Sequence, residues 1–328
     1  MKKGVTIILC TFNGASRLPK TIEHLAKQAV VEDIPWEIIV VDNGSTDNTS
    51  VIVTQEWKKY DLENVSLTIL KESKSGKIYA LEQAFASARF EYSIICDDDN
   101  WLAPNYLETT FRILDSNLEI GAVGGQGIAV TDSLKLPEWF KLYQDGYAIG
   151  EQGKSSGDVS DRGHLWGAGL GTRTFLYREI YKSFPSLLTG RLGKELTAGE
   201  DAEYCQRLIL AGYKLFYDSR LTFKHYMPAS RLTEEYRERL FKGFIESDKV
   251  LSKYYLANSL KNEAKSKSGN FFRLLLISPF RAIFTIDKKK RNRAKDILIF
   301  IWPSTIYPDS LMSKIKQFYQ RNLGPLSD

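Results

Sequence analysis

Three consecutive carboxylates follow an apolar segment in the first third of the chain. Residues 93–96 (SIIC) lead directly into Asp97, Asp98 and Asp99. Neighbouring like charges repel, so positive charge must lie beside them. Carboxylates at i and i+2 beyond a strand can hold Mg²⁺ or Mn²⁺ through oxygen while the ion also binds substrate phosphates. We therefore predict a metal and diphosphate site here. The alternative is an acidic cap on the following helix, for which one Asp would suffice.

The elements around this motif alternate between strand and helix patterns. Short apolar runs rich in β-branched residues occupy 5–10, 37–41, 67–70 and 92–96, and a helical pattern follows each of them. This alternation predicts an α/β fold with a parallel sheet. Ligands of such sheets bind beyond the carboxyl ends of the strands. Residues 11–13, 42–43 and 97–99 should therefore meet at one edge of the sheet.

The pattern changes after Val123. Residues 131–164 suggest loops and antiparallel strands, followed by a helix over 175–184. A second helix should begin at Glu200 and Asp201, and a strand is expected over 214–227. A long helix is expected over 234–260.

The C-terminal part of the chain is basic. From residue 230 onward it has 20 Lys and Arg against 10 Asp and Glu, which gives +10, whereas the remainder carries −5. Residues 271–286 are apolar but too short to span a bilayer, and a basic cluster follows at 288–291. We predict a helix lying on an anionic membrane. The alternative is an amphipathic helix packed on the body of the protein. Nucleic-acid binding fits less well because apolar residues flank the cluster.

The cysteines and the N-terminus bear on location. Cys10, Cys96 and Cys205 lie far apart, as buried free thiols of a reducing compartment do. The first apolar run is too short for a signal peptide. These features favour a cytoplasmic protein, peripheral on the inner face of the membrane.

Four motifs in this order resemble one family. They are CTFNG (10–14), VVDNGSTDNT (40–49), CDDDNWLAPNYLE (96–108) and GEDAEYCQRLILAGYKL (199–215). Together they resemble the inverting, nucleotide-sugar-dependent glycosyltransferases of family 2, over about residues 4–226. The resemblance implies the GT-A fold, a Rossmann-like, mostly parallel central sheet flanked by helices. It implies a catalytic domain at 1–229, with a nucleotide-sugar half at 1–125 and an acceptor half at 126–229. A helical appendage at 230–328 would follow.

The resemblance also implies roles at the donor side. Phe12 would lie against the nucleobase with Thr11 nearby, and its flat ring would supply stacking area. Asp42 and Asn43 would contact base and ribose. Asn43 stands where the family has a second acid, but an amide can still pair with the edge of uracil. Lys77 would contact the nucleotide, and the alternative is an ordinary surface lysine.

Metal and catalytic roles follow in the same way. Asp97 would approach ribose and metal, with Asp98 beside it, and Asp99 would bind Mg²⁺ or Mn²⁺ directly. His225 would reach the metal or the diphosphate, unless it is structural. Asp201 would be the base that deprotonates the acceptor hydroxyl, with Glu200 next to the substrate. In WGAGLGTR (166–173), Arg173 would neutralise phosphate, and the alternative is tight packing of a strand.

These features predict an inverting glycosyltransferase of the hexosyl or N-acetylhexosaminyl type. It would move a sugar from a UDP-sugar to a glycan or lipid-linked acceptor during polysaccharide or glycolipid assembly. A metal-dependent nucleotidyltransferase is the first alternative, but CTFNGASR lacks a glycine-rich phosphate loop. A catalytically silent scaffold is the second, and the intact acidic residues argue against it.

Overall fold

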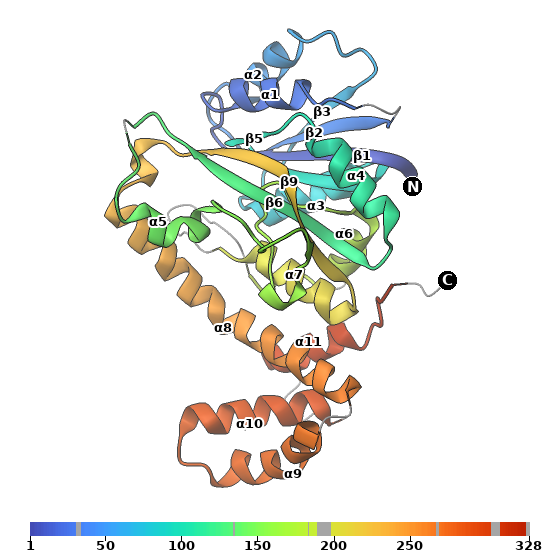
Figure 1. Ribbon diagram of the computed structural model, residues 1–328, viewed down its shortest axis with the longest axis vertical. Coiled ribbons are helices and arrows are strands. Elements are labelled where there is room, and N and C mark those ends of the chain that lie inside the picture. Colours follow the sequence, from blue (N-terminus) through green and yellow to red (C-terminus); the bar gives the residue numbers. More distant parts are fainter. Residues whose placement is uncertain are drawn as a thin grey trace.

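The computed structural model describes residues 1–30, 34–133, 135–182, 184–188, 198–266, 269–302 and 309–325. Its centre is a mixed nine-stranded sheet with the order β3-β2-β1-β4-β8-β6-β9-β5, and β7 pairs with β9 outside this path. Helices cover both faces of the sheet, and the last helices extend away from it (Figure 1). The α/β class predicted from the sequence is confirmed.

The first four strands form the parallel half of the sheet. They are β1 (Lys2–Thr11), β2 (Trp36–Asp42), β3 (Ser66–Lys71) and β4 (Phe90–Asp97). Strand β1 lies between β2 and β4. Successive side chains of a strand point to opposite faces. Ile7 and Leu9 therefore enter one hydrophobic core, and Ile8 and Cys10 enter the other. Burial on both faces explains the uninterrupted apolar run in the sequence.

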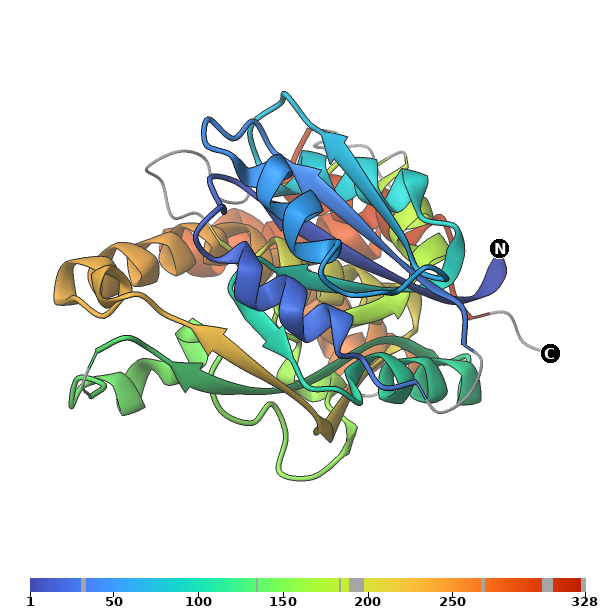
Figure 2. The ribbon, with the colours of Figure 1, turned by 90° about the horizontal axis from the view of Figure 1, so that it is seen from above.

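Helices cover each face of the sheet. One core takes side chains from α1 (Leu18–Ala26), α2 (Thr49–Trp57) and α4 (Tyr106–Ser116). The other takes them from α3 (Lys77–Ser87), α6 (Thr174–Tyr181) and α7 (Glu200–Ala211). Seen from above, α1 and α2 (blue) lie over the neighbouring strands (Figure 2). The alternation of strands and helices predicted for the first 116 residues is confirmed.

The rest of the sheet contains antiparallel pairs, but of its strands only β7 lies within 131–164, where antiparallel strands were expected. Its strands are β5 (Asn100–Leu102), β6 (Ile120–Val130), β7 (Gly157–Asp158), β8 (Gly171–Arg173) and β9 (Lys214–Tyr226). Strand β8 runs antiparallel to both β4 and β6, whereas β9 runs parallel to β6 and antiparallel to β5. A short helix α5 (Phe140–Tyr143) and 3-10 turns at Gln144–Tyr147 and Ser160–Arg162 lie between them.

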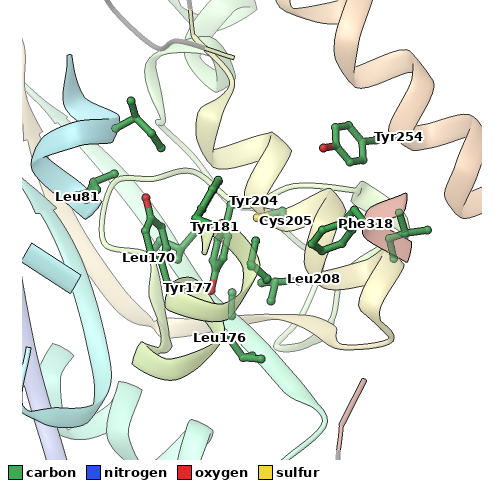
Figure 3. Packing of buried hydrophobic residues seen from close by; sticks show 14 of the residues in the cluster. Leu81, Leu170, Leu176, Tyr177, Tyr181, Tyr204, Cys205, Leu208, Tyr254 and Phe318 are labelled. Atoms are coloured by element: carbon green, nitrogen blue, oxygen red, sulfur yellow. The ribbon is translucent and has the colours of Figure 1, made fainter. Parts of the chain in front are cut away.

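The C-terminal helices share a core with the sheet. After a 3-10 turn (Ala229–Arg231) come α8 (Glu234–Lys265), α9 (Gly269–Phe284), α10 (Lys288–Ile301) and α11 (Leu311–Tyr319). Tyr254 of α8 and Phe318 of α11 belong to the cluster that contains Tyr204 of α7 (Figure 3). The Tyr254 hydroxyl also donates to the fully buried carboxylate of Glu203 at 3.0 Å. Helices α8 and α11 are therefore packed against the sheet and the helices that cover it.

Candidate active site

The strand ends meet at one edge of the sheet. Thr11 pairs with Asp42 and Cys10 pairs with Asp97, so the ends of β1, β2 and β4 lie at the same level. A cavity of about 800 Å³ opens there. This volume is within the range of about 300–1,000 Å³ that is usual for ligand sites. The convergence predicted from the strand order is confirmed. The predicted site residues that line the cavity are Thr11, Phe12, Asn43, Lys77, Asp97, Asp98, Asp99, Glu200, Asp201 and His225.

Two helices begin at the cavity after glycines with positive φ. Gly76 (φ 131°) precedes Lys77 at the start of α3, and Gly199 (φ 106°) precedes Glu200 and Asp201 at the start of α7. A residue with a Cβ atom would be strained in this backbone conformation, which glycine adopts freely. These two glycines let the chain turn sharply into each helix. The turns place a lysine and two acids in the same cavity.

Each of the three carboxylates has its own cationic partner. Asp97 pairs with Lys77. Asp98 accepts hydrogen bonds from Nε and Nη2 of Arg17 at 2.9 and 2.8 Å, and from the Thr11 hydroxyl at 2.6 Å. Asp99 accepts one from Nη1 of Arg231 at 2.6 Å. Side chains of the protein therefore supply the positive charge that the acidic triplet requires.

Charge neutralisation is strongest at Asp99. Its side chain is 5% exposed, and burial alone would raise its pKa. His225, whose Nε2 lies 3.6 Å from Oδ1, and Arg231 together hold the pKa of Asp99 well below its usual range. Burial likewise opposes the charge of Lys77, but Asp97 and Glu200 raise its pKa. Asp99 and Lys77 are therefore both charged at neutral pH.

The side chains around Asp99 include donor atoms of the types that bind divalent ions. Asp97 and Asp99 offer carboxylate oxygens, and His225 makes a 2.8 Å hydrogen bond to the Tyr147 carbonyl through Nδ1. This bond orients the ring with Nε2 toward Asp99, the position from which Nε2 could also reach a metal. Within the described part of the chain, however, no three His, Cys, Asp or Glu side chains converge as a ready metal site. An ion and Arg231 would compete for the oxygens of Asp99.

The nucleobase side is formed by the ends of β1 and β2. Phe12 is 56% exposed at the cavity, unlike the buried aromatic residues of the core. Asp42 lies beside the cavity and not in it, and accepts hydrogen bonds from the Ser50 hydroxyl at 2.6 Å and the Ser45 amide at 2.9 Å. Of these residues, Phe12 thus has the surface that a flat base could stack on.

Asn43 has a structural role that the sequence did not reveal. Its side-chain nitrogen donates to the carbonyls of Glu72 and Lys74 at 3.1 and 2.7 Å, and its oxygen accepts from the Gly76 amide at 2.9 Å. Both N–H groups of the amide are therefore engaged with the backbone before α3. A carboxylate could not make the two donor contacts. This explains why an amide replaces the acid expected at this position.

Asp201 lines the cavity at the start of α7. Its Oδ2 accepts a hydrogen bond of 2.8 Å from the amide of Gly167, and Oδ1 accepts one from the amide of Ala202 at 2.8 Å. The glycine-rich segment 166–170 thus fixes the carboxylate, which lines the cavity. His164 and Trp166 also line the cavity. Burial lowers the pKa of His164, so this imidazole is neutral near pH 7.

The structure gives no support for a phosphate contact by Arg173. Its side chain is 2% exposed and does not line the cavity. The guanidinium donates to the carbonyls of Leu114, Asn117 and Ile120 at 2.6, 2.9 and 3.0 Å. Because β8 lies between β4 and β6, alternation along the strand directs this side chain into the protein. Arg173 therefore satisfies carbonyls at the end of α4, and tight packing is the better description.

Several cavity residues had not been predicted. Arg17 and Arg231 approach the acidic triplet from positions 81 and 132 residues away. Helix α8 forms one wall through a row of side chains at helical spacing: Tyr236, Leu240, Phe244, Ser247, Asp248 and Leu251. The positive charge could be inferred from the triplet, but not its source. The 3.6-residue period predicted helix α8, but it did not predict that this helix lines the cavity.

Comparisons with known proteins agree with this arrangement. Residues 6–162 match the model of glycosyl transferase family 2. The dolichyl N-acetyl-alpha-D-glucosaminyl phosphate 3-beta-D-2,3-diacetamido-2,3-dideoxy-beta-D-glucuronosyltransferase of Methanococcus voltae is 23% identical over 95% of this chain and 88% of its own length. The poly-beta-1,6-N-acetyl-D-glucosamine synthase of Staphylococcus epidermidis is 29% identical over a region that makes up 38% of this chain and 28% of that protein.

Solved structures show the same fold. The TM-score is 0.52 for S. aureus TarS, with 17% identity over 98% of this chain and 54% of that one. It is 0.51 for the Pyrobaculum calidifontis mannosyltransferase PcManGT, solved with GDP-mannose and Mn²⁺, with 18% identity over 98% of this chain and 88% of that one. Residues 6–162 therefore match glycosyl transferase family 2, and the chain shares the GT-A fold of these glycosyltransferases.

Proposed function

We propose that the protein transfers a sugar from a nucleotide-diphospho-sugar, UDP-linked, to an acceptor hydroxyl with inversion at the anomeric carbon. The observation that carries the proposal is the composition of one cavity. Phe12, the Asp97–Asp99 triplet with its cations and Asp201 all line it. A donor bound with its base on Phe12 and its diphosphate beside the triplet would have its sugar in the same cavity as Asp201.

The residues divide the reaction between them. Asp201 takes the proton of the acceptor hydroxyl, whose oxygen forms the new bond to the anomeric carbon while the bond to the diphosphate breaks. Its two backbone hydrogen bonds hold the carboxylate in place for that proton. Lys77 and Arg231, which can move from Asp97 and Asp99 to phosphate oxygens, neutralise the charge of the departing diphosphate.

A divalent ion would be held by Asp97, Asp99 and His225. Mg²⁺ or Mn²⁺ bound there supplies positive charge that stabilises the diphosphate leaving group. The ion is part of this proposal because the carboxylate oxygens of Asp97 and Asp99 are hard ligands that both ions accept. The solved structure of PcManGT with Mn²⁺ is of the same fold.

The acceptor side of the cavity supports a glycan substrate. The half-buried Tyr236 offers an aromatic face, and the exposed Asp145 and Asp248 offer hydrogen-bond acceptors for hydroxyl groups. The named relatives act on a dolichyl-linked N-acetylglucosamine and in the synthesis of poly-N-acetylglucosamine. We therefore propose a role in cell-surface polysaccharide or glycolipid assembly, at the cytoplasmic face of a membrane.

Donor binding can be tested by thermal unfolding with UDP, GDP and their sugar derivatives, with and without Mn²⁺. UDP and UDP-sugars should raise the melting temperature only when Mn²⁺ is present, and Asp99→Ala should abolish that rise. Asp161→Asn removes an exposed carboxylate next to the cavity wall and should keep the full response. A protein that no nucleotide stabilises, or an Asp99→Ala variant that responds like wild type, would refute the donor site.

A further inference from the structure

The largest group of exposed apolar side chains lies far from the cavity, on α9. Phe272, Leu276, Phe280 and Phe284 are spaced by four residues and are 56%, 73%, 68% and 73% exposed. Ile283 belongs to the same row and is 70% exposed. Residues at i and i+4 lie on one face of a helix. They form an apolar stripe along the whole helix, which we call the α9 stripe.

The opposite side of α9 faces the protein. Leu274 packs against the hydrophobic core and Ser278 is buried. Helix α10 lies beside α9, and the two form a hairpin at the end of the molecule opposite α1 and α2 (Figure 1). The hydrophobic core is thus contacted by the other side of α9, and the α9 stripe lies on the outer side of the helix. A contiguous apolar surface of this kind marks a binding surface.

Positive charge surrounds the α9 stripe. Residues 269–301 contain eight Lys and Arg and two Asp. Arg273 and Arg281 are exposed on α9, and Lys288, Lys289 and Lys290 are exposed where α10 begins. One of the two acids, Asp287, accepts hydrogen bonds from the amides of Lys289 and Lys290 and so caps α10. The hairpin of α9 and α10 therefore combines an exposed apolar stripe with exposed basic side chains.

We propose that the α9 stripe docks on an anionic lipid bilayer, with α9 lying in the plane of the interface. Apolar side chains beside Lys and Arg are the composition of helices that lie at the boundary between head groups and acyl chains. Among the described residues, no helix has both the length and the hydrophobicity needed to cross a bilayer. The 16 residues of α9 extend about 24 Å, less than the hydrocarbon core of about 30 Å.

A second copy of the chain fits the surface less well. Dimers of identical subunits bring the same patch of each subunit together. The basic residues around one α9 stripe would then face the same residues of the other copy, and their charges would repel. An anionic bilayer offers acyl chains for the apolar side chains and negatively charged head groups for the basic ones. Lipid is therefore the occupant that matches both properties.

Docking by α9 is separate from the chemistry. The last α8 residue that lines the cavity is Leu251, and α8 continues to Lys265, about 21 Å further along the helix axis. Variants of the α9 stripe should therefore leave donor binding unchanged. The proposal can be tested without donor or acceptor, and its outcome does not depend on the proposed transferase activity.

The test is sedimentation of the full chain with sucrose-loaded vesicles. One set contains phosphatidylcholine alone, and the other contains phosphatidylcholine mixed with phosphatidylglycerol. Wild type should bind the mixed vesicles at least about tenfold more strongly, and added salt should weaken that binding. Leu276→Ser combined with Phe280→Ser should weaken binding to the mixed vesicles by at least about tenfold. Equal binding of wild type to both vesicle sets, or no loss in the double variant, would overturn the proposal.

A matched control separates docking from general hydrophobicity. Leu142 and Phe175 are the same residue types, are 84% and 41% exposed, and lie in α5 and α6. Leu142→Ser combined with Phe175→Ser should bind vesicles within about twofold of wild type. An equal loss in this control would overturn the assignment to α9. So would a wild-type protein that ignores vesicles but forms dimers that the α9 double variant abolishes.

Discussion

Replacing Arg231 with methionine should destabilise the folded protein, because it removes the main partner of the buried carboxylate of Asp99. The two groups are 2.6 Å apart, and their side chains are 24% and 5% exposed. Methionine keeps much of the length and apolar volume of the arginine side chain but carries no charge. The variant therefore tests the ion pair more than the packing.

The size of the effect follows from what remains around Asp99. Removing one partner of a buried ion pair costs about 3–5 kcal/mol. Here His225 stays 3.6 Å away and the side-chain amide of Asn100 donates at 3.2 Å, so part of the stabilisation is retained. We expect a loss of about 2–3 kcal/mol at pH 7. At about 2 °C per kcal/mol for a chain of this length, the melting temperature should fall by roughly 5 °C.

The pH dependence has a defined sign. The pKa of Asp99 is lowered from its ordinary value of 3.8 in the folded protein, in part by Arg231. Stabilisation from such a group is complete above the unfolded pKa and is lost as the pH falls through the folded one. The difference between wild type and Arg231→Met should therefore be the same at pH 7 and pH 5, and shrink below about pH 4.

Chemical denaturation at several pH values, with and without Mn²⁺, measures these differences. Mn²⁺ should stabilise Arg231→Met more than wild type, because the variant has no cation competing for Asp99. Arg112→Met removes a surface pair with Glu108, and should cost less than about 1 kcal/mol. Equal stability of Arg231→Met and wild type at pH 7, or a difference that grows in acid, would refute the reasoning.

Three further changes test other parts of the structure. Asn43→Asp should lower the free energy of unfolding by about 1–3 kcal/mol in urea titrations, because it sets a carboxylate against two carbonyls. An unchanged free energy of unfolding would show that the two hydrogen bonds donated by Asn43 do not stabilise the fold. Arg173→Met should cost about 3 kcal/mol by leaving three carbonyls unsatisfied, while the folded variant keeps its affinity for UDP in calorimetry; a lower UDP affinity would restore the phosphate role. Burial raises the pKa of the Cys10 and Cys205 thiols to about 12 and raises that of Cys96 as well, so the native protein at pH 8 should react with a thiol reagent only after unfolding; rapid native labelling would contradict it.

The sheet was predictable because its strands carry their information locally. The β-branched runs ending at Cys10, Val41 and Cys96 fix both burial and the edge at which polar residues emerge. Phe12 and the Asp97–Asp99 triplet could be placed at one edge for this reason, whereas Asp201 was assigned to the site by the family resemblance. The predicted long helix is α8, which continues to Lys265.

Contacts between distant segments could not be predicted. The charge of the acidic triplet required cations, but nothing local distinguishes Arg17 or Arg231 from other surface arginines. Arg173 illustrates the opposite error: an arginine beside glycines looked like a phosphate ligand, yet a three-residue strand inside the sheet buries it. Side-chain partners across 81 or 132 residues depend on the completed fold.

The most direct test of the proposed mechanism compares donor binding and sugar transfer in Asp201→Asn. The amide keeps the shape of the side chain but cannot take the proton of the acceptor hydroxyl. Affinity for UDP with Mn²⁺ should stay within about threefold of wild type, while the transfer rate should fall by at least about 100-fold. Transfer at the wild-type rate, with donor binding intact, would show that Asp201 is not the base.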